Sequence, residues 1–160
     1  MLNMLRQRRD EDEGFTLIEL MVVVLIIAIL IAIAIPTFLG ARARAQNRAA
    51  QSSLRNALTA AKTMYTDTNN YTSADSSSTG LSTVEPSLQY VAAAVASTGP
   101  KVVSVAAGGG SGTTWSAAAK SDSGNCYWIK DVSTGPGTTF GSGATCTGTA
   151  ADAAAGSTFP

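Results

Sequence analysis

The chain has 160 residues, with 11 basic and 11 acidic side chains, so its formal net charge of zero provides no global attraction toward nucleic acid. It contains no histidine, which excludes catalysis by a histidine base and zinc sites of the His-x-x-x-His type. This length accommodates one modest domain and one additional segment.

Residues 1–14 form a short leader that carries three arginines and four acids and ends at Gly14. We interpret it as a targeting segment that does not belong to the fold. An uncharged run of 22 residues, Leu20 to Ala41, follows shortly after it. As a helix this run reaches roughly 33 Å, which is enough to cross the hydrocarbon core of a bilayer.

Apolar residues cover all sides of this predicted helix, so we expect it to be buried in lipid or among other helices. Pro36 lacks the N–H that would bond to the carbonyl of Ala32, and Gly40 weakens the same region. We therefore predict a kink or local melting at these residues. An ordinary proline kink and a hinge used during assembly are both open interpretations.

A single acid, Glu19, precedes the apolar run. If the chain is cut after Gly14, the new ammonium group of Phe15 lies four residues before Glu19. A carboxylate in apolar surroundings is costly unless a cation pairs with it. When copies of this helix pack side by side, Glu19 of one copy would pair with the Phe15 ammonium of its neighbour and set their axial offset.

The hexapeptide Gly14-Phe15-Thr16-Leu17-Ile18-Glu19 and the apolar run resemble the N-terminus of the type IV pilin family, including the pseudopilins of type II secretion. The resemblance covers about residues 1–65. It implies cleavage after Gly14 by a membrane prepilin peptidase, N-methylation of Phe15 and polymerisation through the first helix. The implied partners are copies of the same chain, the pilus assembly platform with its ATPase, and the membrane before assembly.

The same resemblance implies a precursor in the cytoplasmic membrane, with the leader inside, and a filament at the cell surface. Charge alone does not decide the orientation, because three arginines lie on each side of the run. An ordinary secretory signal, cut after Ala43 or Ala45, is the competing interpretation. Its apolar region is normally 7–15 residues long, which is shorter than this run.

Residues 42–66 are rich in good helix formers, so we predict one helix from Thr16 to Thr66, whose second part is amphipathic. Its apolar stripe consists of Leu54, Leu58, Ala61 and Tyr65. Arg44, Arg48, Arg55 and Lys62 lie mostly off that stripe. We interpret these basic residues as a solvated face, and a surface for nucleic acid or anionic lipid as the alternative.

Residues 67–160 are predicted to form a Ser/Thr/Gly-rich β head, entered through a helix stop at residues 67–70 and a surface loop at residues 72–85. Short apolar stretches separated by turn residues predict an antiparallel meander. The predicted strands are Gln89–Val95, Lys101–Ala106, Trp115–Ala119, Cys126–Val132 and Thr138–Phe140. The fold class is α+β, with the long helix packed on a small antiparallel sheet.

The predicted head core combines aliphatic and aromatic residues, and the helix stripe enlarges it. Its members are Leu81, Leu88, Tyr90, Val91, Val95, Val103, Val105, Trp115, Tyr127, Trp128, Ile129, Val132 and Phe140. Two cysteines in a chain with the marks of export predict a Cys126–Cys146 disulfide, and pilins often carry a similar C-terminal loop. Asn70-Tyr71-Thr72 has the pattern of a glycosylation acceptor, which we expect to be unused.

Asp131 and Asp152 lie in the region where major pseudopilins hold calcium. Neither belongs to a run of oxygen ligands, so we expect no metal site and interpret both as solvated acids. Residues 124–131 resemble pilin heads from Gram-positive actinobacteria. No cofactor is expected.

The resulting hypothesis is a structural subunit of a type IV pilus, most like a major pilin, and not an enzyme. A pseudopilin and a DNA-binding minor pilin of competence are the alternatives that share the N-terminus. A single-pass anchored surface enzyme is the alternative of another class, and the lack of histidine and of any nucleophile motif argues against it. Adhesion, twitching motility, DNA uptake and conduction are all tasks that such a filament serves.

Overall fold

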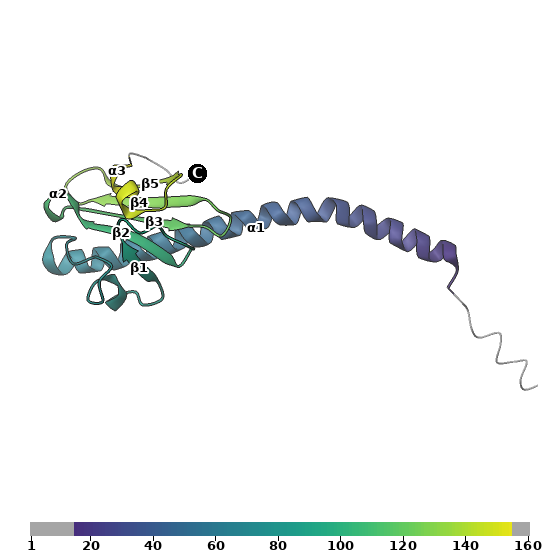
Figure 1. Cartoon of the computed structure of the whole chain (residues 1–160), viewed down its shortest axis with the longest axis horizontal. Coiled ribbons are helices and arrows are strands. Elements are labelled where there is room, and N and C mark those ends of the chain that lie inside the picture. Colours follow the sequence, from purple (N-terminus) through teal and green to yellow (C-terminus); the bar gives the residue numbers. More distant parts are fainter. Residues whose placement is uncertain (1–14, 155–160) are drawn as a thin grey trace, which may run out of the picture. The chain divides into compact units, whose positions relative to one another are not determined.

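The computed structural model describes residues 15–154, which divide into two compact units on either side of the Ala41–Arg42 bond. The helix α1, Leu17–Thr68, belongs to both units and confirms the predicted long helix (Figure 1). The other elements, all in the second unit, are η1 (Leu81–Thr83), β1 (Gln89–Ala92), β2 (Val102–Gly108), α2 (Gly109–Gly112), β3 (Thr114–Lys120), β4 (Cys126–Val132), β5 (Gly137–Gly143) and α3 (Gly148–Ala153).

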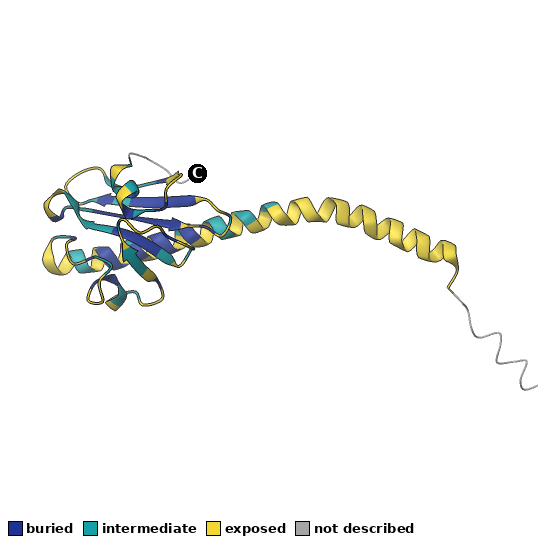
Figure 2. Cartoon of the chain, in the orientation of Figure 1, coloured by how far each residue is buried: buried dark blue, intermediate teal, exposed yellow. Residues whose placement is uncertain are grey.

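The described part of the first unit consists of Phe15, Thr16 and the N-terminal part of α1, and its large apolar side chains are exposed on every side of the helix (Figure 2). Their exposed fractions range from 44% at Val23 to 75% at Leu17. Within residues 15–154, α1 is the one helix long and apolar enough to cross a membrane. The expectation of a 22-residue spanning segment therefore fits the structure in length and composition.

α1 continues without a break through Pro36 and Gly40. The hydroxyl of Thr37 donates to the carbonyl of Ile33 at 3.0 Å, one position after the carbonyl of Ala32 that Pro36 leaves without a donor. Local melting at these residues is therefore absent in the single chain. Melting during assembly stays a prediction.

The helix ends where the sequence predicts a stop. Asn69 adopts a left-handed conformation, with a φ of 54°, and its N–H donates to the carbonyl of Tyr65 at 2.7 Å. Asparagine tolerates this conformation better than most residues, which makes it a common helix-ending residue. The chain then returns to the sheet, because the N–H of Tyr71 donates to the carbonyl of Gly112 at 2.7 Å.

The five strands form one sheet in chain order, and four of them make the expected antiparallel meander. The prediction is wrong for β1, which pairs with β2 in parallel and ends at Ala92, three residues before the predicted end. A parallel neighbour requires a connection that returns along the whole strand. Since β1 has only four residues, the short segment between Ala92 and Val102 is long enough.

Polar contacts hold this connection in place. The Ser104 hydroxyl contacts the carbonyls of Ala92 and Ala93, at 3.2 and 3.4 Å. The Ser97 hydroxyl accepts from the N–H of Lys120 at 2.8 Å. These bonds attach the connection to β2 and β3 and give partners to backbone groups at its two ends.

The main core lies between one face of the sheet and the second part of α1. Leu54 and Ala61 of the predicted stripe are buried, whereas Leu58 and Tyr65 are partly buried. The buried stripe also includes Ala50, Ala57 and Ala60. These small helix residues belong to the same core as Ala117 and Ala119 of the central strand β3.

Most predicted core residues of the head are buried or partly buried. Val95 is an error, since it lies outside β1 and is 51% exposed. On the opposite face of the sheet, Trp128 and Ala118 pack with Ala151 of α3, a helix that the sequence analysis did not predict. α3 begins at a Thr147 cap, whose side chain accepts from the N–H of Ala150.

The predicted disulfide is confirmed. Cys126 and Cys146 are bonded, and their Cα atoms are 5.2 Å apart. The bond joins the first residue of β4 to the segment that precedes α3, and the carbonyl of Cys146 accepts from the N–H of Ser97 at 2.8 Å. Three segments that are distant in the sequence therefore meet at this cystine.

Replacing both Cys126 and Cys146 with serine is expected to lower the free energy of unfolding of the head by about 3 kcal/mol, because the unfolded chain loses its cross-link. Urea unfolding of the full chain in detergent measures this, with fluorescence of the chain's two tryptophans, both in the head, as the signal. The exposed neighbour substitution Thr145→Ala is the control. Equal stability of oxidised and serine forms would contradict the prediction.

Candidate processing and assembly site

The residues of the predicted processing motif that the structure describes form the start of α1. Thr16 precedes the helix, and its carbonyl and hydroxyl accept from the N–H of Glu19, at 3.1 and 3.3 Å. Threonine at this position, with glutamate three residues later, is a recognised pattern of helix starts. The sequence after the expected cleavage point therefore begins a helix immediately.

The side chains of Phe15 and Glu19 are both exposed in the single chain. Among the described residues, Glu19 makes no ion pair. Gly14 and the rest of the leader lie outside the described residues, so the cleavage point is not seen. Phe15 thus lies two residues before α1 and Glu19 lies in its first turn, where the carboxylate has no ion-pair partner among residues 15–154.

The apolar helix surface after Glu19 determines which surroundings this part of α1 requires. Burying one large aliphatic side chain is worth about 1.5–3 kcal/mol. A whole helix segment of such side chains, exposed on all sides, is unstable in water and needs cover from lipid or other apolar helices. Any cover of that kind also surrounds Glu19 with apolar groups, where an unpaired carboxylate is costly.

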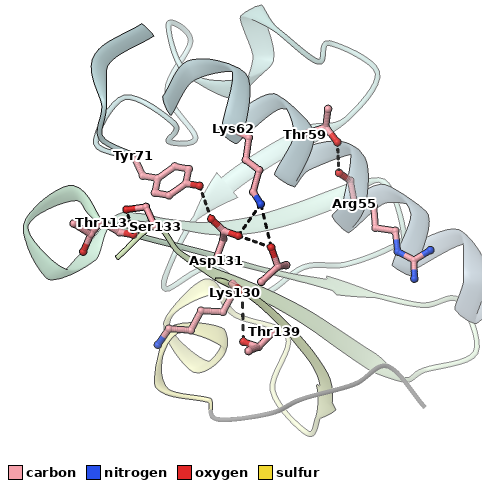
Figure 3. A network of polar contacts seen from close by, with 10 residues as sticks. Arg55, Thr59, Lys62, Tyr71, Thr113, Lys130, Asp131, Ser133 and Thr139 are labelled. Atoms are coloured by element: carbon pink, nitrogen blue, oxygen red, sulfur yellow. Dashed lines mark hydrogen bonds and ion pairs between the residues drawn. The ribbon is translucent and has the colours of Figure 1, made fainter. Parts of the chain in front are cut away.

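A second polar site lies inside the head, where Asp131 of β4 contacts α1 (Figure 3). Asp131 is only 3% exposed. The Lys62 ammonium lies 2.9 Å from one carboxylate oxygen, the Tyr71 hydroxyl donates to the other at 2.5 Å, and the Thr138 hydroxyl also donates to the group. The interpretation of Asp131 as a solvated acid is therefore wrong.

These contacts set the ionisation of the group. Burial by itself raises the pKa of Asp131, but hydrogen bonds from Thr138, Tyr71 and Lys62, with the charge of Lys62, bring its pKa below the ordinary value. Burial, followed by the hydrogen bond to Asp131, raises the pKa of Tyr71. Near neutral pH the site thus holds a carboxylate and a neutral phenol that donates to it.

Asp152 differs from Asp131, because it is half-exposed and lies 3.5 Å from the ammonium of Lys130. That ammonium also donates to the Asp152 carbonyl. Within residues 15–154, no three His, Cys, Asp or Glu side chains gather in a group able to hold a metal ion. Asp131 is instead bound by Lys62, Tyr71 and Thr138, and Asp152 is paired with Lys130.

The Lys62–Tyr71–Asp131 contact was missed by the sequence analysis, which placed Lys62 on a solvated face. One signal was available: Asp131 follows Trp128 and Ile129 in a strand, on the same face as Ile129. An acid at a core-facing position requires a cation or several donors. The sequence could not show which of the head's cations would reach it.

Comparisons with known proteins concern the N-terminus. Residues 11–35 match the family model of the prokaryotic N-terminal methylation motif, the class III signal of type IV pilins and pseudopilins. A search of the curated proteins found no match, and a search of the solved structures found none either. The chain therefore carries a pilin-like prepilin signal, which implies processing by a prepilin peptidase and fits a membrane-anchored precursor.

Asp131→Asn is expected to lower the free energy of unfolding of the head by about 1–3 kcal/mol at pH 7, since a charged acceptor of buried hydrogen bonds is lost. The folded pKa of Asp131 is depressed, so its contribution is complete above the ordinary aspartate pKa of about 4 and is lost as pH falls through the lower folded value. The difference between variant and wild type should therefore shrink at pH 3.

Urea unfolding at both pH values, followed by tryptophan fluorescence of the full chain in detergent, measures this difference. Asp122→Asn changes an exposed acid that makes no ion pair, so it should alter stability by less than about 0.5 kcal/mol. Wild-type stability of Asp131→Asn at pH 7 would show that the contact contributes nothing.

Proposed function

We propose that this protein is a structural subunit of a type IV pilus filament. It is made as a membrane-inserted prepilin, cleaved after Gly14, N-methylated at Phe15 and polymerised through the first part of α1. The observation that carries the proposal is the uncovered apolar surface of that helix segment directly behind a prepilin methylation motif. Lipid covers this surface before assembly, and neighbouring copies cover it afterwards.

In this mechanism Glu19 sets the axial offset between copies. Its carboxylate, which makes no ion pair within residues 15–154, pairs with the Phe15 ammonium of the neighbouring copy. Any other register leaves one charge unpaired among apolar side chains, which costs about 3–5 kcal/mol. Gly14 is small enough for the peptidase to approach the backbone, and Pro36 and Gly40 loosen the helix as it leaves the bilayer.

The second part of α1 and the β head remain folded during this transfer. The alanine-rich contact with the sheet, the Asp131 site and the cystine each tie α1 or the last strands into the head. The protein acts as the substrate of a peptidase and as a building block, and its own chemistry is that of assembly. A long surface filament distinguishes a pilus subunit from a pseudopilin of a secretion system.

The processing step predicts the N-terminus of the mature protein. Protein sheared from the cell surface should begin with N-methyl-phenylalanine at Phe15, as read by mass spectrometry of the N-terminal peptide. Substituting Gly14 with a bulky residue should leave the precursor uncut. A mature chain that starts at Arg44 or Gln46 would instead identify ordinary signal peptidase and refute the proposal.

Glu19→Gln should reduce filament yield by at least about tenfold, because the Phe15 ammonium of each neighbour loses its partner. Electron microscopy of sheared filaments and immunoblotting of the sheared fraction measure the yield. Thr16→Ala is the matched control, since it weakens the helix start but keeps the carboxylate. If both variants have the same effect, Glu19 acts on the helix start and not on assembly.

A further inference from the structure

The charges of the second unit are distributed unequally along α1. Among the described residues, two lysines are matched with acids inside the head, Lys62 with Asp131 and Lys130 with Asp152. Five other cations are exposed and make no ion pair; we call them the basic end: Arg42, Arg44, Arg48, Lys101 and Lys120. Water solvates each of these exposed cations in the single chain, so the feature of interest is where they lie relative to the acids of the same unit.

Contacts within the second unit place these five residues together. The Asn47 side chain accepts from Ser123 at 2.5 Å and from Asn125 at 3.4 Å, so the turn after β3 lies beside the start of this unit's helix. Lys120 is the last residue of β3, and Lys101 immediately precedes β2, near the same end of the sheet. Asp122 is the one acid of this turn.

Three other acids of the second unit are Asp67 in the last turn of α1, Asp75 in the segment after α1, and Glu85 beside residues 56–63 of the helix; we call them the acidic side. Asp67 is exposed in the last turn of α1. Glu85 lines a shallow pocket together with Asn56 and Thr63 of the same helix. Asp75 follows Ala74, whose carbonyl accepts from the indole N–H of Trp115.

The arginines of the basic end and Asp67 of the acidic side are separated along the helix axis, whereas Glu85 lies beside residues 56–63 between them. Arg48 and Asp67 lie 19 residues apart on α1, about 28 Å at the standard rise. Parallel copies displaced by about this distance along their axes would therefore bring the basic end of one head level with Asp67 of another. Such a contact is heterologous, and repeating it builds a helical polymer with no limit on length.

We propose that the basic end of each head docks on the acidic side of a second copy of this chain in the filament. This inference rests on the proposed function, because it requires parallel, axially displaced copies. Anionic lipid would account for the cations alone and would leave the acidic side without a role. Complementary charges of this kind set register and speed association more than they add affinity.

A charge exchange tests the contact. Arg44→Glu with Arg48→Glu should lower filament yield about tenfold, and Asp67→Lys with Glu85→Lys should do the same, since like charges then face each other. The chain that carries all four substitutions should assemble to within about threefold of wild type. Filament yield is measured by electron microscopy and immunoblotting of the sheared fraction.

Two controls separate the contact from damage to the fold. The side chain of Glu85 accepts hydrogen bonds from Ser87. Asp67→Asn with Glu85→Gln removes both charges but retains this acceptor, so it should lower the filament yield less than charge reversal does. Tryptophan fluorescence and the intact disulfide verify the head of each variant. Thr134→Glu adds a charge on the exposed turn after β4 and should leave the yield unchanged.

The outcomes are distinguishable. If wild-type chains form no filaments, or do not start at Phe15, the proposed function itself fails. If filaments form and reversal at the basic end has no effect, only the present inference is refuted. It is likewise refuted by a second pattern, in which Arg44→Glu with Arg48→Glu fails to assemble, Asp67→Lys with Glu85→Lys assembles normally, and the fourfold variant does not recover. The arginines would then bind lipid or nucleic acid instead of a second copy.

Discussion

The constraint on which this protein depends is a helix segment that has no cover of its own. Its aliphatic side chains are exposed on all sides from Leu17 to Leu39, and no element of the described chain is packed on them. Water cannot serve as a lasting environment for such a surface, so the segment requires lipid or other apolar helices. One carboxylate at its start converts that nonspecific requirement into a requirement for a particular register.

In the head, a small, glycine-rich sheet packs against the second part of α1. Alanines on both surfaces share a core with Leu54, Trp115 and Ile129, and the many dispersion contacts of such a core add up although each one is small. Asp131 fixes how these elements are oriented, because its carboxylate accepts hydrogen bonds from groups on α1, on the turn after α1 and on β5. Lys62 is half-exposed, so water screens the ion pair, and the hydroxyl donors supply much of the stabilisation.

The charged groups of the molecule fall into two kinds, those paired within one chain and those without a partner in it. Inside the head a buried acid is satisfied within the chain, whereas Glu19 and the basic end have no partner among the described residues of one copy. Charged groups without a partner in one chain are available for contacts between copies. The proposed filament gives each of them a partner of opposite charge without any change in the fold of the head.

The sequence by itself determined the long helix, a stop within residues 67–70, the approximate positions of the five strands and the cystine, because each follows from apolar spacing, turn residues or cysteine count. The parallel pairing of β1, the short helix α3 and the burial of Asp131 were decided only by the tertiary structure. Strand direction depends on where a connection finds hydrogen-bond partners, here Ser104 and Ser97. The ion pair of Asp131 joins residues 69 positions apart, and no local pattern identifies Lys62 as its partner, since contact between them requires that helix and sheet have already packed.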